Sequence, residues 1–153
     1  MRAGIIAAAC AALSAGAGAP PAGADTGEFV GSATCGACHE REYELWRDTP
    51  HARAYATLGD DARRAECRTC HATGDAPLGR AYFPGVGCES CHGAGAAYAP
   101  ADIMKNVPLA RALGLRELGT AEARAAVCDR CHAESKTRIR PFETEEAWER
   151  IAH

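Results

Sequence analysis

The pattern Cys-x-x-Cys-His occurs four times in this chain of 153 residues and constrains its fold more than any other feature. In each copy the two thiols are spaced to add across the two vinyl groups of one haem, and the next residue offers an imidazole to its iron as the proximal ligand. The sequence therefore predicts four covalently bound haem c groups. The attachment cysteines are Cys35, Cys38, Cys67, Cys70, Cys88, Cys91, Cys128 and Cys131, and the proximal histidines are His39, His71, His92 and His132.

Two other uses of paired cysteines fit the pattern less well. Zinc ribbons and redox-active dithiols also contain Cys-x-x-Cys, but neither requires a histidine directly after the second cysteine in all four copies. Eight of the nine cysteines lie within the motifs, and Cys10 alone lies outside them. We therefore interpret the motifs as haem attachment sites rather than zinc or disulfide sites.

The N-terminus predicts export. Arg2 is followed by an apolar, alanine-rich stretch over residues 3–13, and the sequence around Ala22 and Ala24 resembles a signal-peptidase site. We expect a signal peptide over residues 1–24 and one tetrahaem cytochrome c domain over residues 25–153. Haem c is attached outside the bacterial cytoplasm, so a periplasmic protein is expected.

Other features limit the partners. The apolar stretch is shorter than the roughly 20 residues that span a bilayer, so no stable membrane insertion is expected. A lipid anchor on Cys10 is the alternative, although few apolar residues precede that cysteine. The formal net charge of -3 argues against a nucleic-acid partner. The expected partners are a redox protein donor, a redox protein acceptor and the cytochrome c maturation machinery.

Composition predicts a small side-chain core. The chain has only three Phe, two Trp and four Tyr, so four porphyrins would supply the apolar volume that its side chains lack. We expect a mainly α fold with long loops, a small multihaem cytochrome c fold organised around four stacked haems.

Local patterns predict short helices around the motifs. Thr49-Pro50 has the composition of a helix N-cap followed by the first helical residue, and Thr120 is a second candidate cap. Residues 74–87 predict a loop or short hairpin, and Gly93 and Gly95 are expected to let the chain pass close to a porphyrin. The expected helices cover residues 35–48, 50–58, 60–67, 108–115, 121–131 and 144–153.

Distal ligands are in short supply. Only His51 and His153 remain for the opposite faces of four irons. His51 follows His39 by roughly 18 Å if the chain between them is helical, so we expect it to bind a haem of another motif. His153 is expected to reach a haem from the last helix, with a frayed terminus as the alternative. Met104 is the candidate thioether ligand, and packing is its alternative role.

These residues resemble the tetrahaem cytochrome c-554 family. The resemblance implies a helical periplasmic electron carrier whose haems form closely stacked pairs. It also implies that His51 and His153 ligate haems of other motifs and that the haem on His71 is five-coordinate. The matching segments are residues 29–39, 46–52, 85–95 and the stretch from Pro141 to His153.

One departure from the family is visible. Members with three bis-histidine haems have a third distal histidine shortly after the third motif, where this chain has Tyr98 and no histidine before His132. By that resemblance the haem on His39 lacks its usual ligand, and Met104, Tyr98, an exogenous ligand or an open site would take its place. Electron transfer is the expected function. The alternative is reduction of nitric oxide or another small nitrogen oxide at a five-coordinate haem.

Overall fold

The computed structural model describes residues 27–74, 82–133 and 142–153, so the expected signal peptide and Cys10 lie outside the described residues. The protein is mainly helical, as predicted. Its helices are α1 (Ser32–Gly36), α2 (Glu40–Arg47), α3 (Pro50–Arg53), the 3-10 helix η1 (Ala54–Arg63), α4 (Ala65–His71), α5 (Cys88–His92), α6 (Ala101–Met104), α7 (Val107–Ala112), α8 (Ala121–His132) and α9 (Thr144–Glu149).

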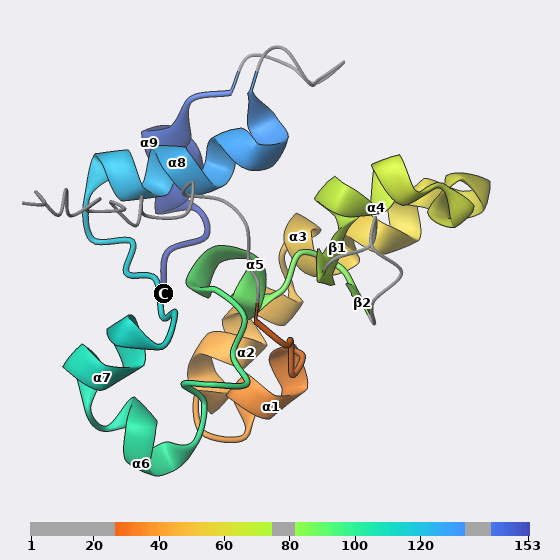
Figure 1. Ribbon diagram of the computed structural model, residues 1–153. Helices are drawn as coiled ribbons and strands as arrows, with labels where there is room; N and C mark the ends of the chain where they lie inside the picture. The colour runs from red at the N-terminus through yellow and green to blue at the C-terminus, as the bar shows by residue number, and fades with distance from the viewer. Residues whose placement is uncertain (1–26, 75–81, 134–141) are drawn as a thin grey trace, which may run out of the picture.

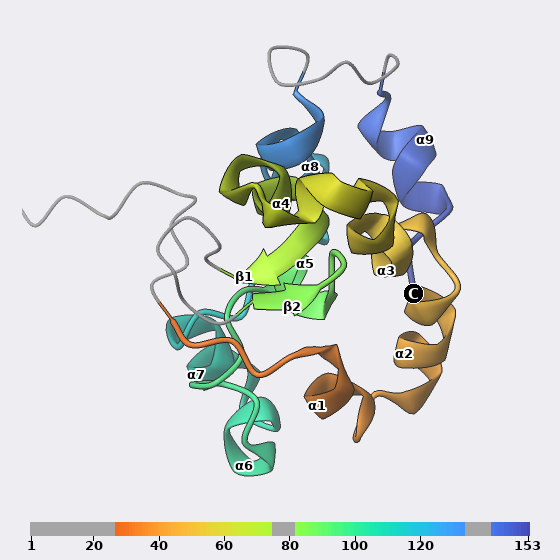
Figure 2. The same ribbon diagram turned by 90° about the vertical axis from the view of Figure 1, so that its right-hand side faces the viewer.

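One helix lies between two groups of helices at opposite ends of the molecule. Helices α8 and α9 lie at one end and α1, α6 and α7 at the other, in both views of the ribbon (Figures 1 and 2). Helix α5 lies between these ends, next to the sheet formed by β1 (Ala72–Gly74) and β2 (Tyr82–Pro84). The helix that carries the third motif is therefore central.

Three of the four motif histidines end a helix. His71, His92 and His132 are the last residues of α4, α5 and α8, so each Cys-x-x-Cys-His segment forms helical turns that bring its cysteines and histidine together. The first motif differs, because α1 ends at Gly36 and His39 is the N-cap residue of α2.

Two predicted caps are confirmed. The Thr49 hydroxyl accepts a hydrogen bond from the Ala52 N–H at 3.3 Å, and Pro50 is the first residue of α3. The Thr120 hydroxyl accepts one from the Ala123 N–H at 3.2 Å at the start of α8. These contacts satisfy N–H groups that have no partner within the helix.

Two predicted helix boundaries were wrong and a third was confirmed. The helix expected over residues 35–48 is interrupted, because His39 has non-helical angles (φ -110°, ψ 55°) that turn the chain between α1 and α2. The break expected before Asp60 is confirmed, because Gly59 has non-helical angles (φ 54°, ψ -123°) and separates two helical segments within η1. The last helix begins after Glu143 rather than at a Thr144 cap and ends at Glu149, so His153 lies beyond it.

The segment predicted as a loop or short hairpin is a hairpin in its described parts. Strands β1 and β2 pair antiparallel, with Thr73 opposite Phe83. Gly85 follows with φ +89°, and a Cβ there would lie 2.5 Å from the Ala52 carbonyl oxygen. Glycine therefore allows this strand exit to pass directly over α3.

Few large apolar side chains are buried within the described residues. The buried apolar side chains are Ala72, Ala94, Tyr98, Ala110 and Leu118, while Leu45, Val107, Leu109 and Leu113 are 39–50% exposed. A side-chain core this small agrees with the expectation that another apolar group fills the interior. None of the described helices is long and apolar enough to cross a membrane.

Candidate functional site

The first and third motifs are in contact. The Ser32 hydroxyl at the start of α1 accepts a hydrogen bond from the Cys88 N–H at 3.1 Å. The thiols of Cys35 and Cys88 also hydrogen-bond to each other, which raises the pKa of Cys35 and lowers that of Cys88 to about 6. None of the eight motif cysteines forms a disulfide with another described residue, so each can form a thioether bond to haem.

The third motif also contacts the surroundings of the second and fourth motifs. The Ser90 hydroxyl lies 2.9 Å from that of Thr73, which follows the second motif, and the Ser90 carbonyl accepts a hydrogen bond from Arg130 of the fourth motif at 3.2 Å. Helix α5 is thus joined to all three other motifs or their flanking residues. Burial raises the pKa of the Cys91 thiol to about 11, and that thiol interacts electrostatically with Cys128.

His51 lies next to His132, the proximal histidine of the fourth motif. Their ring centroids are 6.2 Å apart and the ring planes are tilted by 55°. Burial is the main cause that lowers the pKa of both imidazoles, so both favour the neutral form that binds metal.

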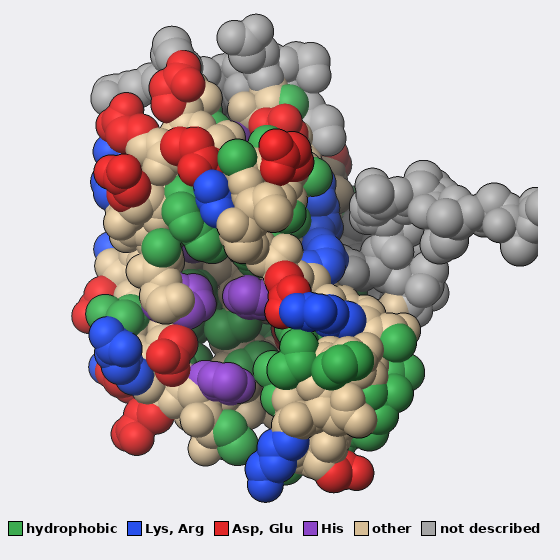
Figure 3. Space-filling view, turned by 90° about the vertical axis from the view of Figure 1, so that its left-hand side faces the viewer, with side chains coloured by type: hydrophobic (Ala, Val, Ile, Leu, Met, Phe, Trp, Pro, Cys, Tyr) green, Lys and Arg blue, Asp and Glu red, His purple; other side chains and the backbone are tan. Residues whose placement is uncertain are grey.

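His153 lies next to His92, the proximal histidine of the third motif. Their ring centroids are 6.3 Å apart at an interplanar angle of 63°. Burial lowers the pKa of His92 as well. The space-filling view in Figure 3 shows histidine side chains around a hollow in one face of the molecule.

Both spacings fit an iron atom between the rings. Metal–nitrogen bonds of about 2.0–2.1 Å on opposite sides of one ion, with about 1.1 Å from each nitrogen to its ring centre, place the two centroids about 6.3 Å apart. Stacked rings lie closer, as His132 and Phe142 do at 4.2 Å. The residues present therefore fit a haem held between each histidine pair.

The orientation of the imidazoles supports the same fit. Nδ1 of His71 lies 2.8 Å from the Ala54 carbonyl, Nδ1 of His92 lies 3.1 Å from the Arg116 carbonyl, and Nδ1 of His153 lies 3.0 Å from the Ile151 carbonyl. A carbonyl partner makes Nδ1 the protonated nitrogen, which leaves the Nε2 lone pair for a metal. Nδ1 of His132 is buried and has no hydrogen-bond partner among the described residues.

His39 and His71 have no such histidine partner. The two non-motif histidines are placed beside His132 and His92, and all six histidines of the chain lie within the described residues. Tyr98 does not fill the gap, because its hydroxyl donates to the carbonyls of Gly93 and His92 at 2.7 and 3.2 Å and its side chain is 5% exposed.

The role of Met104 stays a prediction. It is the last residue of α6 and is partly buried.

Gly93, expected to approach a porphyrin, is required for another close contact, since a Cβ there would lie less than 2.5 Å from the Gly114 carbonyl oxygen. Within the described residues, no group of three or more His, Cys, Asp or Glu side chains is arranged to hold a metal ion.

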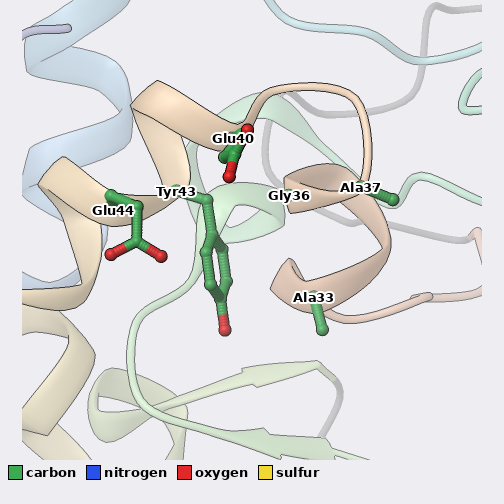
Figure 4. Close-up of a pocket in the computed structure, with 6 residues that line it drawn as sticks. All are labelled: Ala33, Gly36, Ala37, Glu40, Tyr43 and Glu44. Carbon is green, nitrogen blue, oxygen red and sulfur yellow. The ribbon is translucent and has the colours of Figure 1, made fainter.

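A cavity of about 490 Å³ lies beside the first motif. In Figure 4 the Tyr43 ring of α2 extends along α1, with Glu40 and Glu44 on the same helix as Tyr43. Gly36 and Ala37, the two residues between the first pair of cysteines, also line this cavity. Neither histidine pair lines it, so the cavity is separate from the paired imidazoles.

Sequence reasoning missed two residues of the site. The ring of Phe142 stacks on His132 at an interplanar angle of 12°. The carboxylate of Glu89, inside the third motif, is 1% exposed and binds three backbone N–H groups. Glu89 sits where a motif usually has a variable residue, so only its burial identifies it.

Paired imidazoles beside Cys-x-x-Cys-His helices define a c-type cytochrome. The family model described as cytochrome c554 and c-prime matches residues 34–93. This match agrees with the resemblance, and the region it covers is similar to that family.

A curated relative supports the same family. The chain is 30% identical over 91 residues to cytochrome c-554 of Nitrosomonas europaea, a match that covers 44% of this chain. It covers 39% of that protein, so the chain spans about two fifths of the length of this relative. No solved structure matches the chain.

Proposed function

We propose that the protein is a periplasmic tetrahaem cytochrome that carries electrons between two redox partners. The observation that supports this most is the spacing of His51 from His132 and of His153 from His92, because both distances suit an iron atom with two axial imidazoles. The cysteines of the four attachment motifs, which form no disulfide among the described residues, supply the covalent sites.

The contacts between motifs suggest the order of the four centres. The thiols of Cys35 and Cys88 join the first motif to the third, and Cys91 and Cys128 bring the third near the fourth. Cys131 of the fourth motif lies 4.0 Å from the carbonyl of Thr69 in the second. The resulting order is first, third, fourth, second. Haem, when bound, supplies one-electron chemistry at each iron.

This order separates two kinds of site. The third and fourth motifs, in the middle, have paired histidines, whereas the first and second motifs, at the ends, have none. The protein thus holds two imidazoles around each central iron and leaves each end position with its proximal histidine. Electron donors and acceptors would dock near those ends, and the negative net charge suits basic partners.

The proposal predicts the mass and the redox behaviour of the mature protein. Protein produced with a cytochrome c maturation system should be heavier than the chain after residue 24 by four haem groups. A potentiometric titration followed by visible absorption should then show four one-electron transitions. A bare polypeptide mass, or loaded protein that shows no reduction by a soluble donor, would contradict the proposal.

A second function is favoured by the unpaired histidines. His39 and His71 have no imidazole opposite them, so a small ligand would find a free face at each iron. This supports reduction of nitric oxide or another small nitrogen oxide. Consumption of nitric oxide by the reduced protein, followed with an electrode, tests it. Reduced protein whose absorption spectrum does not change with nitric oxide would exclude this activity.

A further inference from the structure

Glu89 is a buried carboxylate between two haem attachment motifs. Its Oε1 accepts hydrogen bonds from the N–H groups of Val30 at 2.9 Å and Gly95 at 2.7 Å, and its Oε2 accepts one from Gly31 at 2.7 Å. Its side chain is 1% exposed. Glu89 is therefore held from three sides by backbone.

The partners of Glu89 suit an ionised carboxylate. All three are N–H donors, and an ionised carboxylate only accepts hydrogen bonds, whereas a protonated one would need an acceptor for its own O–H. Because the Glu89 carboxylate is buried, protein rather than water surrounds its charge. The charge is therefore screened less and acts over a longer distance than a surface charge.

The charge of Glu89 lies close to two haem attachment motifs. It lies within α5, next to the attachment residue Cys88, and binds Gly31, the N-cap residue of α1, which carries Cys35. The field of Glu89 is one of the causes that raise the pKa of Cys35. The carboxylate thus lies close to the places where two haems are attached.

We propose that Glu89 is a positioning residue that holds the first and third motifs together and whose buried charge lowers the reduction potentials of the haems on His39 and His92. A negative charge near iron favours the ferric state, since reduction adds a further negative charge. The inference rests on the proposed tetrahaem function, because it requires haem at both motifs.

The fourth motif provides a matched control. Asp129 occupies the same place between its two cysteines as Glu89 does in the third motif, but it is exposed to solvent. Asp129→Asn therefore removes one charge at an equivalent position where water screens it. Glu89→Gln removes one charge at the buried position and keeps the side-chain length.

The test is a potentiometric titration of holoprotein variants whose four haems are first verified by mass spectrometry. Glu89→Gln should raise two of the four midpoints, each by about a tenfold change in the oxidised-to-reduced ratio, or 59 mV for one electron. Asp129→Asn should leave those midpoints in place. Four unchanged midpoints in loaded Glu89→Gln, or equal shifts in both variants, would overturn the inference.

A second pair of variants covers the case in which Glu89→Gln does not load haem. Glu89→Asp and Glu89→Asn share a shorter side chain and differ in charge, so their comparison isolates the charge. The Asn variant should show the two higher midpoints, and identical midpoints in the pair would overturn the inference. Wild-type protein without four haems would instead contradict the proposed function itself.

Discussion

The imidazole of His153 lies opposite that of His92, 6.3 Å between ring centroids, although the two residues are far apart in the sequence. Helix α9 makes this possible by packing beside α8, where the Arg124 guanidinium binds Glu145 at 2.9 and 2.5 Å. The end of the chain is thereby directed towards the third motif.

Removal of this imidazole should change the spin state of one haem. In His153→Ala the iron on His92 would keep one axial histidine, so the ferric spectrum should show the loss of one low-spin haem and the gain of one high-spin haem. Electron paramagnetic resonance measures both. His51→Ala should do the same for the haem on His132.

The double variant provides the check on both assignments. It should have no low-spin bis-histidine haem left if each histidine serves a different iron. A His153→Ala spectrum identical to that of the wild type would show that His153 does not bind iron.

Carbon monoxide should count the open irons. In a tetrahaem protein two irons would lack a second imidazole, so titration of the fully reduced protein should end at two carbon monoxide molecules per chain, and at three in His153→Ala. Absorption changes in the Soret region measure the end point. An end point of one would mean that Met104 ligates the haem on His39, and Met104→Leu would then restore the second site.

Acidification should release α9 before the rest of the fold. The hydrogen bond from Arg124 lowers the pKa of Glu145 below its ordinary value of 4.5. A carboxylate with a depressed pKa in the folded state contributes stability above the unfolded value and loses it as the pH falls through the folded one. We therefore expect the low-spin signal of the haem on His92 to decrease below pH 4.5.

The variant Glu145→Gln distinguishes loss of the Arg124–Glu145 ion pair from general acid unfolding. Glu145→Gln should already show a weakened low-spin signal at neutral pH and no further step attributable to Glu145. Glu146→Gln is the control, because Glu146 pairs with Arg150 at the C-terminal end of α9 rather than with a residue of α8. Equal behaviour of the two variants would refute the prediction.

The cap of α8 should contribute measurable stability. Thr120→Ala removes the acceptor for the Ala123 N–H and should lower the free energy of unfolding by about 1 kcal/mol. Urea denaturation of the holoprotein, followed by circular dichroism, measures this. Thr120→Ser keeps the hydroxyl and should stay close to the wild type, and a loss as large as that of Thr120→Ala would argue against the cap.

Features that depend on neighbouring residues could be predicted from the sequence. The four motifs, the cap residues Thr49 and Thr120 and the helical character depend on neighbouring residues, and the structure agrees with those caps and with that character. The family was also identified correctly from motif segments. The break of the first predicted helix was missed because helical periodicity does not report the turn at His39.

Contacts between residues far apart in the chain could not be predicted from the sequence. The spacing of His51 from His39 and the family resemblance predicted that His51 and His153 would ligate haems of other motifs. Their partners, however, depend on how α3 and α9 pack against the rest of the chain. Glu89 was missed for a similar reason, since a glutamate between two cysteines is ordinarily solvated and its burial arises from the folding of Val30 and Gly95 around it.

The central position of α5 makes tolerance to substitution uneven across the chain. A change at Ser90 would disturb both Thr73 and Arg130, and so would be felt near two other attachment sites at once. The side chains of Val107 and Leu109 in α7, and of Leu113 at its C-terminal end, are instead 39–41% exposed. Variation among natural homologues should therefore concentrate at these exposed positions, which would also be the safest places to attach an electrode linker or a label.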